Sequence, residues 1–126
     1  MDKALSLLAL ARKGGIAELG EEPVGGAARG GKAYVILVAK DASDHTWRRA
    51  KSFAAGTEQQ CVRLPWTKDQ LGAAIGRDTL AIAAITDVQM ALALVAALPQ
   101  EESNKPALEV LTAKAAKARQ RQQEAK

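Results

Sequence analysis

The chain has 126 residues, of which 48% are apolar and 25% charged, and this fits one globular domain with room for a short tail. One cysteine, Cys61, and one histidine, His45, cannot supply a disulfide framework or a His/Cys metal cluster, so we expect no metal and no cofactor. The net charge is +4. Residues 1–111 hold thirteen Lys/Arg and thirteen Asp/Glu, so the whole positive excess lies in residues 112–126.

The apolar runs and the aromatic content exclude further classes. Residues 4–11 are apolar after Lys3, but Asp2 cancels that charge and the run is short, so a signal peptide is disfavoured. Residues 88–98 form the longest other apolar run, well below the ~20 residues of a membrane span. We therefore expect a cytoplasmic protein without a membrane partner. The four aromatic residues are too few for the stacking platforms of RRM or OB domains, namely Tyr34, Trp47, Phe53 and Trp66.

The first thirty residues predict two helices. Residues 4–11 carry apolar side chains at helical spacing after Asp2, an N-cap residue, and Gly14 with Gly15 supplies the stop. A short apolar stretch follows at 16–19. Residues 20–23, Gly-Glu-Glu-Pro, are typical of a second helix N-terminus. Because Gly25 and Gly26 each cost about 0.8 to 1 kcal/mol in a helix interior, this helix needs tertiary packing before Gly30 and Gly31 end it.

Residues 33–99 predict strands that alternate with helices. Residues 33–39 and 80–85 are continuous apolar runs, typical of strands buried on both faces, and residues 61–64 form a shorter strand. Three helices lie between or after them: one capped by Ser43 or Asp44 and closing near Gly56, one with a Thr67/Gln70 capping box and a stop at Gly76, and one capped by Thr86 or Asp87 and stopped by Pro99.

This alternation predicts an α/β fold in which most connections are parallel crossovers and each sheet face has a helical cover. We predict a three-layer α/β/α sandwich with a central four-stranded mixed sheet over residues 1–100. Residues 101–126 are predicted as a basic tail, helical or disordered, that adds little to the core. If the tail is helical, basic residues 114, 117 and 121 share one face, opposite an apolar stripe of Leu108, Leu111, Ala115 and Ala118.

No set of catalytic side chains stands out. Cys61 lies in an apolar strand, and His45 beside Asp44 has no third partner. Residues 26–32 nearly match a phosphate-binding loop, but Ala33 stands where a hydroxyl is needed, and the segment runs from helix into strand rather than the reverse. We therefore expect no enzymatic activity and no small-molecule substrate.

Several collinear motifs resemble a known family. They are LALARKG at 8–14, GEE at 20–22, GKA at 31–33, VAKDAS at 38–43, TKDQLGAAIG at 67–76 and AITD at 84–87. Over residues 5–98 the chain resembles the L7Ae/L30e/S12e ribosomal-protein superfamily, and specifically its small bacterial L7Ae-like members. The resemblance implies an α/β/α sandwich that binds kink-turn RNA through the start of the second helix and the loop after the fourth helix.

The resemblance also implies which residues contact RNA. The family pattern Gly-x-Asn-Glu-x-x-Lys falls on Gly20, Glu22, Pro23 and Gly26, so three positions depart from it. Each lost base contact costs about 1 to 3 kcal/mol, so we expect weakened recognition. The RNA-binding residues that we nominate are Gly20, Glu21, Glu22, Gly26, Arg29, Lys32, Lys40, Arg77, Asp78, Thr79 and Leu80.

Two functions from different classes stay open. The first is a non-enzymatic RNA-binding protein, ribosome-associated or binding structured, kink-turn-like RNA with weakened recognition, and the basic tail favours it. The second is a protein-interaction module that keeps the fold and has lost kink-turn recognition, which Pro23 and Gly26 favour.

Overall fold

The computed structural model describes residues 2–124, so Lys126 of the predicted basic tail lies outside the described residues. Its four strands form one mixed sheet in the order β1-β4-β2-β3. They are β1 (Ala17–Leu19), β2 (Val35–Val38), β3 (Gln60–Arg63) and β4 (Ile82–Ile85). Strand β4 runs antiparallel to both β1 and β2, and β2 runs parallel to β3, with Val38 opposite Ile82 on one side and Arg63 on the other.

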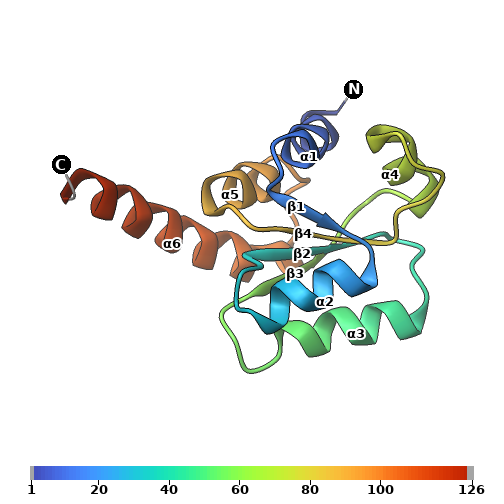
Figure 1. The fold of residues 1–126 in the computed structure, drawn as a ribbon, viewed down its shortest axis with the longest axis horizontal. Coiled ribbons are helices and arrows are strands. Elements are labelled where there is room, and N and C mark those ends of the chain that lie inside the picture. Colours follow the sequence, from blue (N-terminus) through green and yellow to red (C-terminus); the bar gives the residue numbers. More distant parts are fainter. Residues whose placement is uncertain (1, 125–126) are drawn as a thin grey trace.

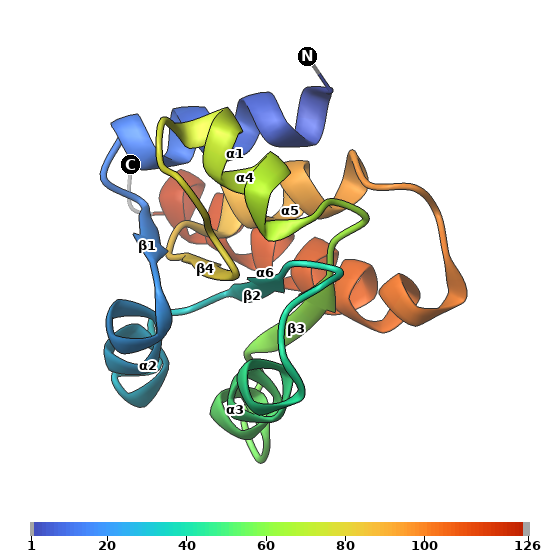
Figure 2. The same ribbon diagram turned by 90° about the vertical axis from the view of Figure 1, so that its right-hand side faces the viewer.

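Helices cover both faces of the sheet, as Figure 2 shows. α1 (Lys3–Lys13), α4 (Lys68–Ile75) and α5 (Val88–Ala96) lie on one face, and α2 (Glu21–Arg29) and α3 (Asp44–Ala54) on the other. The alternation of side chains along β2 divides the interior accordingly. Val35 and Leu37 belong to a first core under α1, α4 and α5, and Ile36 and Val38 to a second core over α2 and α3. The predicted three-layer sandwich with a four-stranded mixed sheet is confirmed.

Local sequence signals set the helix ends. The Ser43 and Asp87 side chains accept from the backbone N–H of Thr46 and Met90, so these two residues, rather than Asp44 and Thr86, are the N-caps. The Thr67/Gln70 capping box is formed in both directions. Gly76 ends α4 in the left-handed conformation, at φ 76° and ψ 27°.

The expectation of mostly parallel crossovers is wrong, because only the β2–β3 pairing is parallel. The reason is the connection from β3 to β4 through α4, which does not carry the chain back to the end of the sheet where β3 began. The turn at Gly76 brings the chain back to the start of α4, where the Leu80 N–H donates to the Lys68 carbonyl at 2.9 Å. β4 therefore enters the sheet at the end where β3 left it and runs in the opposite direction.

The C-terminal segment forms one long helix, α6 (Lys105–Glu124), after the short 3-10 turn η1 (Glu102–Asn104). The expectation that it adds little to the core is wrong for its first half. Ala107, Leu111 and Ala115 are buried, with Leu111 inside the first core, and Gln89 Nε2 donates to the Ala115 carbonyl at 3.0 Å. Alanines one turn either side of Leu111 let the helix lie close to its neighbours.

The second half of α6 extends away from the body (Figure 1). We call residues 117–124 the arm. All of them are exposed except the half-buried Ala118. Among the described residues, no helix is long and apolar enough to cross a membrane.

Candidate nucleic-acid interface

The sheet has two ends with different chemistry. We call the end where β2 and β3 finish and β4 begins the loop end, since it carries residues 76–79. We call the opposite end, where β2 and β3 begin and β4 finishes, the arm end. Helix α6, which continues into the arm, contacts this end through the ion pair of Lys114 with Glu58, just before β3. Helix α2 begins at the loop end and finishes near the arm end.

Gly20 links β1 to α2 at the loop end. Its N–H donates to the carbonyl of Ile82 at 3.0 Å, and its φ of 99° is one that side-chain-bearing residues rarely adopt. Among the described residues, no side chain caps α2 at this position. The positive end of the helix dipole and the first amide groups, those of Glu21 and Glu22, therefore lie beside the start of β4 without a side-chain cap.

The loop of residues 76–79 lies directly on α4. The Arg77 N–H donates to the Gly72 carbonyl at 2.8 Å. A Cβ added to Gly72 would lie 2.7 to 2.8 Å from the backbone carbonyls of Arg77 and Asp78, so glycine is needed for this approach. Arg77, Asp78 and Thr79 are exposed. Leu80 is buried in the first core, so its side chain supports the loop and is not presented to a ligand.

Lys40 joins this end from the turn after β2. Its own N–H donates to the Trp66 carbonyl, and the preceding Ala39 N–H donates to the Ala81 carbonyl, both at 2.9 Å. The Lys40 side chain is exposed. The structure therefore brings Gly20, Glu21 and Glu22 together with Lys40 and the 77–80 segment.

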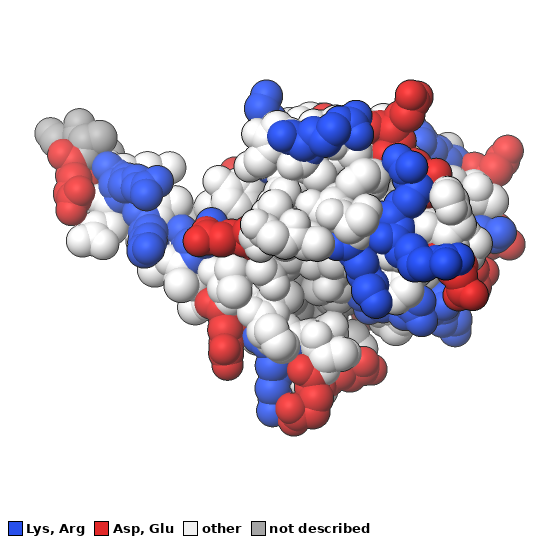
Figure 3. All heavy atoms as spheres, turned by 90° about the horizontal axis from the view of Figure 1, so that it is seen from below, with Lys and Arg blue, Asp and Glu red and all other residues white. Residues whose placement is uncertain are grey.

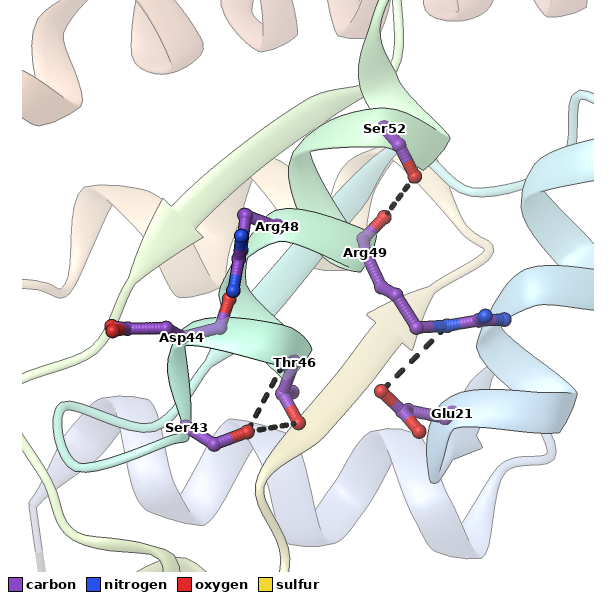
Figure 4. A network of polar contacts seen from close by, with 7 residues as sticks. All are labelled: Glu21, Ser43, Asp44, Thr46, Arg48, Arg49 and Ser52. Carbon is purple, nitrogen blue, oxygen red and sulfur yellow. Dashed lines mark hydrogen bonds and ion pairs between the residues drawn. The ribbon is translucent and has the colours of Figure 1, made fainter.

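Glu21 is turned toward α3, as Figure 4 shows. Its Oε1 lies 3.7 Å from Nε of Arg49, and this oxygen is buried without a hydrogen bond among the described residues. The Arg49 guanidinium also lies over the Phe53 ring, 5.3 Å from its centroid. Arg49 could not be predicted from the sequence, because a pair between two helices leaves no local spacing signal.

The remaining nominated residues lie away from the loop end. Arg29 is the last residue of α2, about 12 Å along the helix axis from Glu21, and Lys32 follows in the turn before β2. Gly26 is exposed between the two ends, and a Cβ there would meet nothing within 4 Å. Among the nominated residues that gather at the loop end, the carboxylates of Glu21, Glu22 and Asp78 outnumber Lys40 and Arg77.

Cys61 packs against the second core from the sheet side. Burial raises the pKa of its thiol to about 11, although Lys51 and Arg63 act in the opposite direction. A thiol with this pKa is protonated at neutral pH and is a weak nucleophile. Within residues 2–124, no group of three or more His, Cys, Asp or Glu side chains could hold a metal ion.

Neither a family model nor a curated protein sequence matches the chain. Solved structures do. The chain is similar to a protein of unknown function from Bacillus halodurans, with 26% identity and a TM-score of 0.72 over 77% of this chain and 97% of that one. It is also similar to a Giardia lamblia 15.5kD RNA binding protein, with 16% identity and a TM-score of 0.56 over 89% of this chain and 84% of that one. The shared architecture is the sandwich that the L7Ae-like resemblance implies.

Proposed function

We propose that this chain is a non-enzymatic RNA-binding protein of the L7Ae-like class, cytoplasmic and ribosome-associated or bound to kink-turn-like RNA. One observation carries the proposal: the fold gathers the uncapped start of α2, the exposed loop of residues 76–79 and Lys40 at one end of the sheet. The fold that the chain shares with an RNA binding protein supports it.

Each part of the loop end suits a different feature of a bent RNA. The uncapped amide groups of Glu21 and Glu22 and the helix dipole favour a phosphate or a purine acceptor. Thr79 and Asp78 offer oxygen acceptors for base amino groups, and Lys40 and Arg77 offer cations to phosphates. These contacts need an opened groove or unstacked bases, because side chains cannot enter the narrow major groove of a regular RNA helix.

Recognition of a kink-turn is weakened in this proposal. Glu22, Pro23 and Gly26 stand where the family pattern has an amide, a carboxylate and a lysine. In addition, the Glu21 carboxylate is occupied by Arg49. We expect a kink-turn hairpin to bind at most about tenfold better than a duplex of equal length, which corresponds to about 1.4 kcal/mol.

The test is a binding titration of the full chain with both RNAs at two salt concentrations. The double variant Lys40→Ala/Arg77→Ala should weaken binding of the hairpin, and Lys105→Ala, which removes an exposed lysine paired with Glu102, serves as the control. Sedimentation with ribosomes checks the ribosomal association. A thousandfold preference for the hairpin would contradict the weakened recognition, and no binding to either RNA at low salt would contradict the proposed function.

The protein-interaction module remains a second candidate, and Pro23 and Gly26, which replace the carboxylate and the lysine of the family pattern, favour it. Among the nominated residues at the loop end, three carboxylates stand against two cations, and Arg49 pairs with one of the carboxylates, so attraction for phosphate is weak there. Under this alternative, neither RNA binds above the non-specific level, and substitutions at Lys40 or Arg77 leave that level unchanged.

A further inference from the structure

Two adjoining cavities form a groove at the arm end. The first has a volume of about 340 Å³ and lies between the end of α2 and the segment before β3, and the second, of about 370 Å³, lies between that segment and α6. Both are lined by Thr57, Glu58 and Lys114, so the two cavities adjoin at these residues. We call this feature the arm-end groove.

The wall of the groove beside α2 is held by a well-bonded side chain. Gln59 Oε1 accepts from the Ala33 N–H at 3.0 Å, and Gln59 Nε2 donates to the Ala28 carbonyl at 3.1 Å. Gln59 thereby ties the end of α2 to the start of β2 and to the segment before β3. The hydrogen bonds fix the shape of this wall without a ligand.

Cations surround the groove. Arg29 and Lys114 line its first cavity, Lys117 lines the second, and the exposed Lys32 follows Arg29 and Gly31 along the chain. Within the part of the chain that the structure describes, Glu58 is the one carboxylate that lines either cavity, and it forms an ion pair with Lys114. This pair lowers the pKa of Glu58, so its carboxylate is charged at neutral pH.

The arm continues this array of cations. Lys114, Lys117 and Arg121 recur at i, i+3 and i+7, so they follow one face of α6 over about 10 Å. Figure 3 shows lysine and arginine side chains on the extended part of α6, at the left, and others over the α2–α3 layer. A small anion would fill one cavity only, whereas a row of this length suits a polyanion with regularly spaced charges.

We infer that the arm-end groove and the arm form a second RNA contact, which binds backbone phosphates. In the absence of RNA, Glu58 is paired with Lys114, and a phosphate takes the place of the Glu58 carboxylate when RNA binds. The inference rests on the proposed function and explains how the RNA charge is neutralised, since the loop end carries more nominated carboxylates than cations. It assigns sequence readout to the loop end and electrostatic affinity to the arm end.

Two substitutions with opposite effects test the inference on the full chain. Glu58→Gln removes the competing charge and should raise affinity for a duplex and a hairpin alike, by up to about fivefold, the value of an exposed ion pair. Lys114→Gln/Lys117→Gln should lower affinity for both RNAs and flatten the slope of log affinity against log salt by about 1.4 to 1.8. Lys105→Gln, on the same helix, is the control for loss of one lysine charge outside the groove, and circular dichroism checks folding.

The outcomes separate this inference from the proposed function. If both groove variants bind RNA like the wild type while Lys40→Ala/Arg77→Ala binds less, the loop end binds RNA and the second contact is refuted. If the wild type binds neither RNA, the proposed function itself fails. If inorganic pyrophosphate or an acidic peptide competes with the duplex as strongly as an equal concentration of RNA phosphate, the groove takes a small anion or a protein instead, and the inference is overturned.

Discussion

Gly72 and Gly26 both lie inside helices, but their surroundings are opposite. A Cβ on Gly72 would meet the carbonyls of Arg77 and Asp78 at 2.7 to 2.8 Å, whereas a Cβ on Gly26 would meet nothing within 4 Å. We expect Gly72→Ala to destabilise the protein by about 1 to 2 kcal/mol, because overpacking against backbone outweighs the gain in helix propensity. Urea unfolding measures this change, and an unchanged or raised midpoint would show that the loop does not rest on Gly72.

Gly26 offers the matched substitution. Gly26→Ala should stabilise the fold by about 0.8 to 1 kcal/mol through helix propensity alone. Gly26→Lys should stabilise it by a similar amount and also raise RNA affinity, because it restores the phosphate contact that the family pattern implies. Unfolding and RNA titration of both variants separate the two effects. Equal RNA affinity of the alanine and lysine variants would refute the motif alignment at this position.

The burial of Cys61 predicts how its reactivity and the stability of the fold depend on pH. Its folded pKa of about 11 lies above the ordinary value of about 8.5, so the fold favours the protonated thiol. The resulting stabilisation is complete below about pH 8.5 and is lost as the pH rises toward 11. The rate of alkylation by iodoacetamide should therefore reach half of its maximum near pH 11 in the folded protein. The urea-unfolded chain is the control, with a midpoint near 8.5, and the same midpoint in the folded protein would contradict the burial argument.

At the scale of elements, α6 has two halves with different roles. Ala107, Leu111 and Ala115 are buried, while residues 117–124 extend from the body. A chain cut after residue 116 should keep its melting temperature. The slope of log RNA affinity against log salt should flatten by about 2.8 to 3.6, since four cations are removed. A chain cut after residue 104 should lose stability, because it uncovers the first core.

Leu111→Ala in the full chain checks the same division, with an expected loss of about 3 kcal/mol on chemical denaturation. If the cut after residue 104 leaves the melting temperature unchanged, residues 101–126 form a separate unit, as the domain boundary at residue 100 predicts.

Elements whose limits depend on local chemistry could be predicted from the sequence. The stop at Gly76, the Thr67/Gln70 box and the strands near residues 35–38 and 82–85 all follow from a few neighbouring residues. The direction of β4 could not be predicted, because it depends on the end of the sheet to which the chain returns after α4. The burial of Ala107 was missed since an alanine carries little apolar surface to reveal a buried face.

The candidate site could be predicted from the sequence only in part, because its contacts join segments that are distant along the chain. The start of α2 and the 77–80 segment were nominated through the resemblance, and the fold places them together. Arg29 and Lys32 were grouped with them, but the helix rise of 1.5 Å per residue already separates Arg29 from Glu21 by about 12 Å. The Lys114–Glu58 pair joins segments more than fifty residues apart and had no sequence signal.

At the scale of the whole molecule, the two cores share one sheet, and each has its own tryptophan. Trp66 packs against the first core and Trp47 against the second. Because β2 and β4 each contribute side chains to both cores, we expect a single cooperative unfolding transition. The single-tryptophan variants Trp47→Phe and Trp66→Phe should give urea curves with the same midpoint by fluorescence and by circular dichroism. A fluorescence midpoint that differs from the circular dichroism midpoint of the same variant would show that one layer opens alone.

The loop after α4 brings the chain back to the start of that helix, and this has a consequence for how the fold can diversify. Residues 67–80 leave the sheet and re-enter it at one place, closed by the Leu80 to Lys68 hydrogen bond, so no strand depends on what residues 77–79 are. Three outward side chains can therefore be exchanged as a set while the scaffold keeps its geometry. A library randomised at these three positions, with Gly72, Gly76 and Leu80 retained, should keep the fold. It would test whether these side chains set the RNA preference that the proposed function assigns to the loop end.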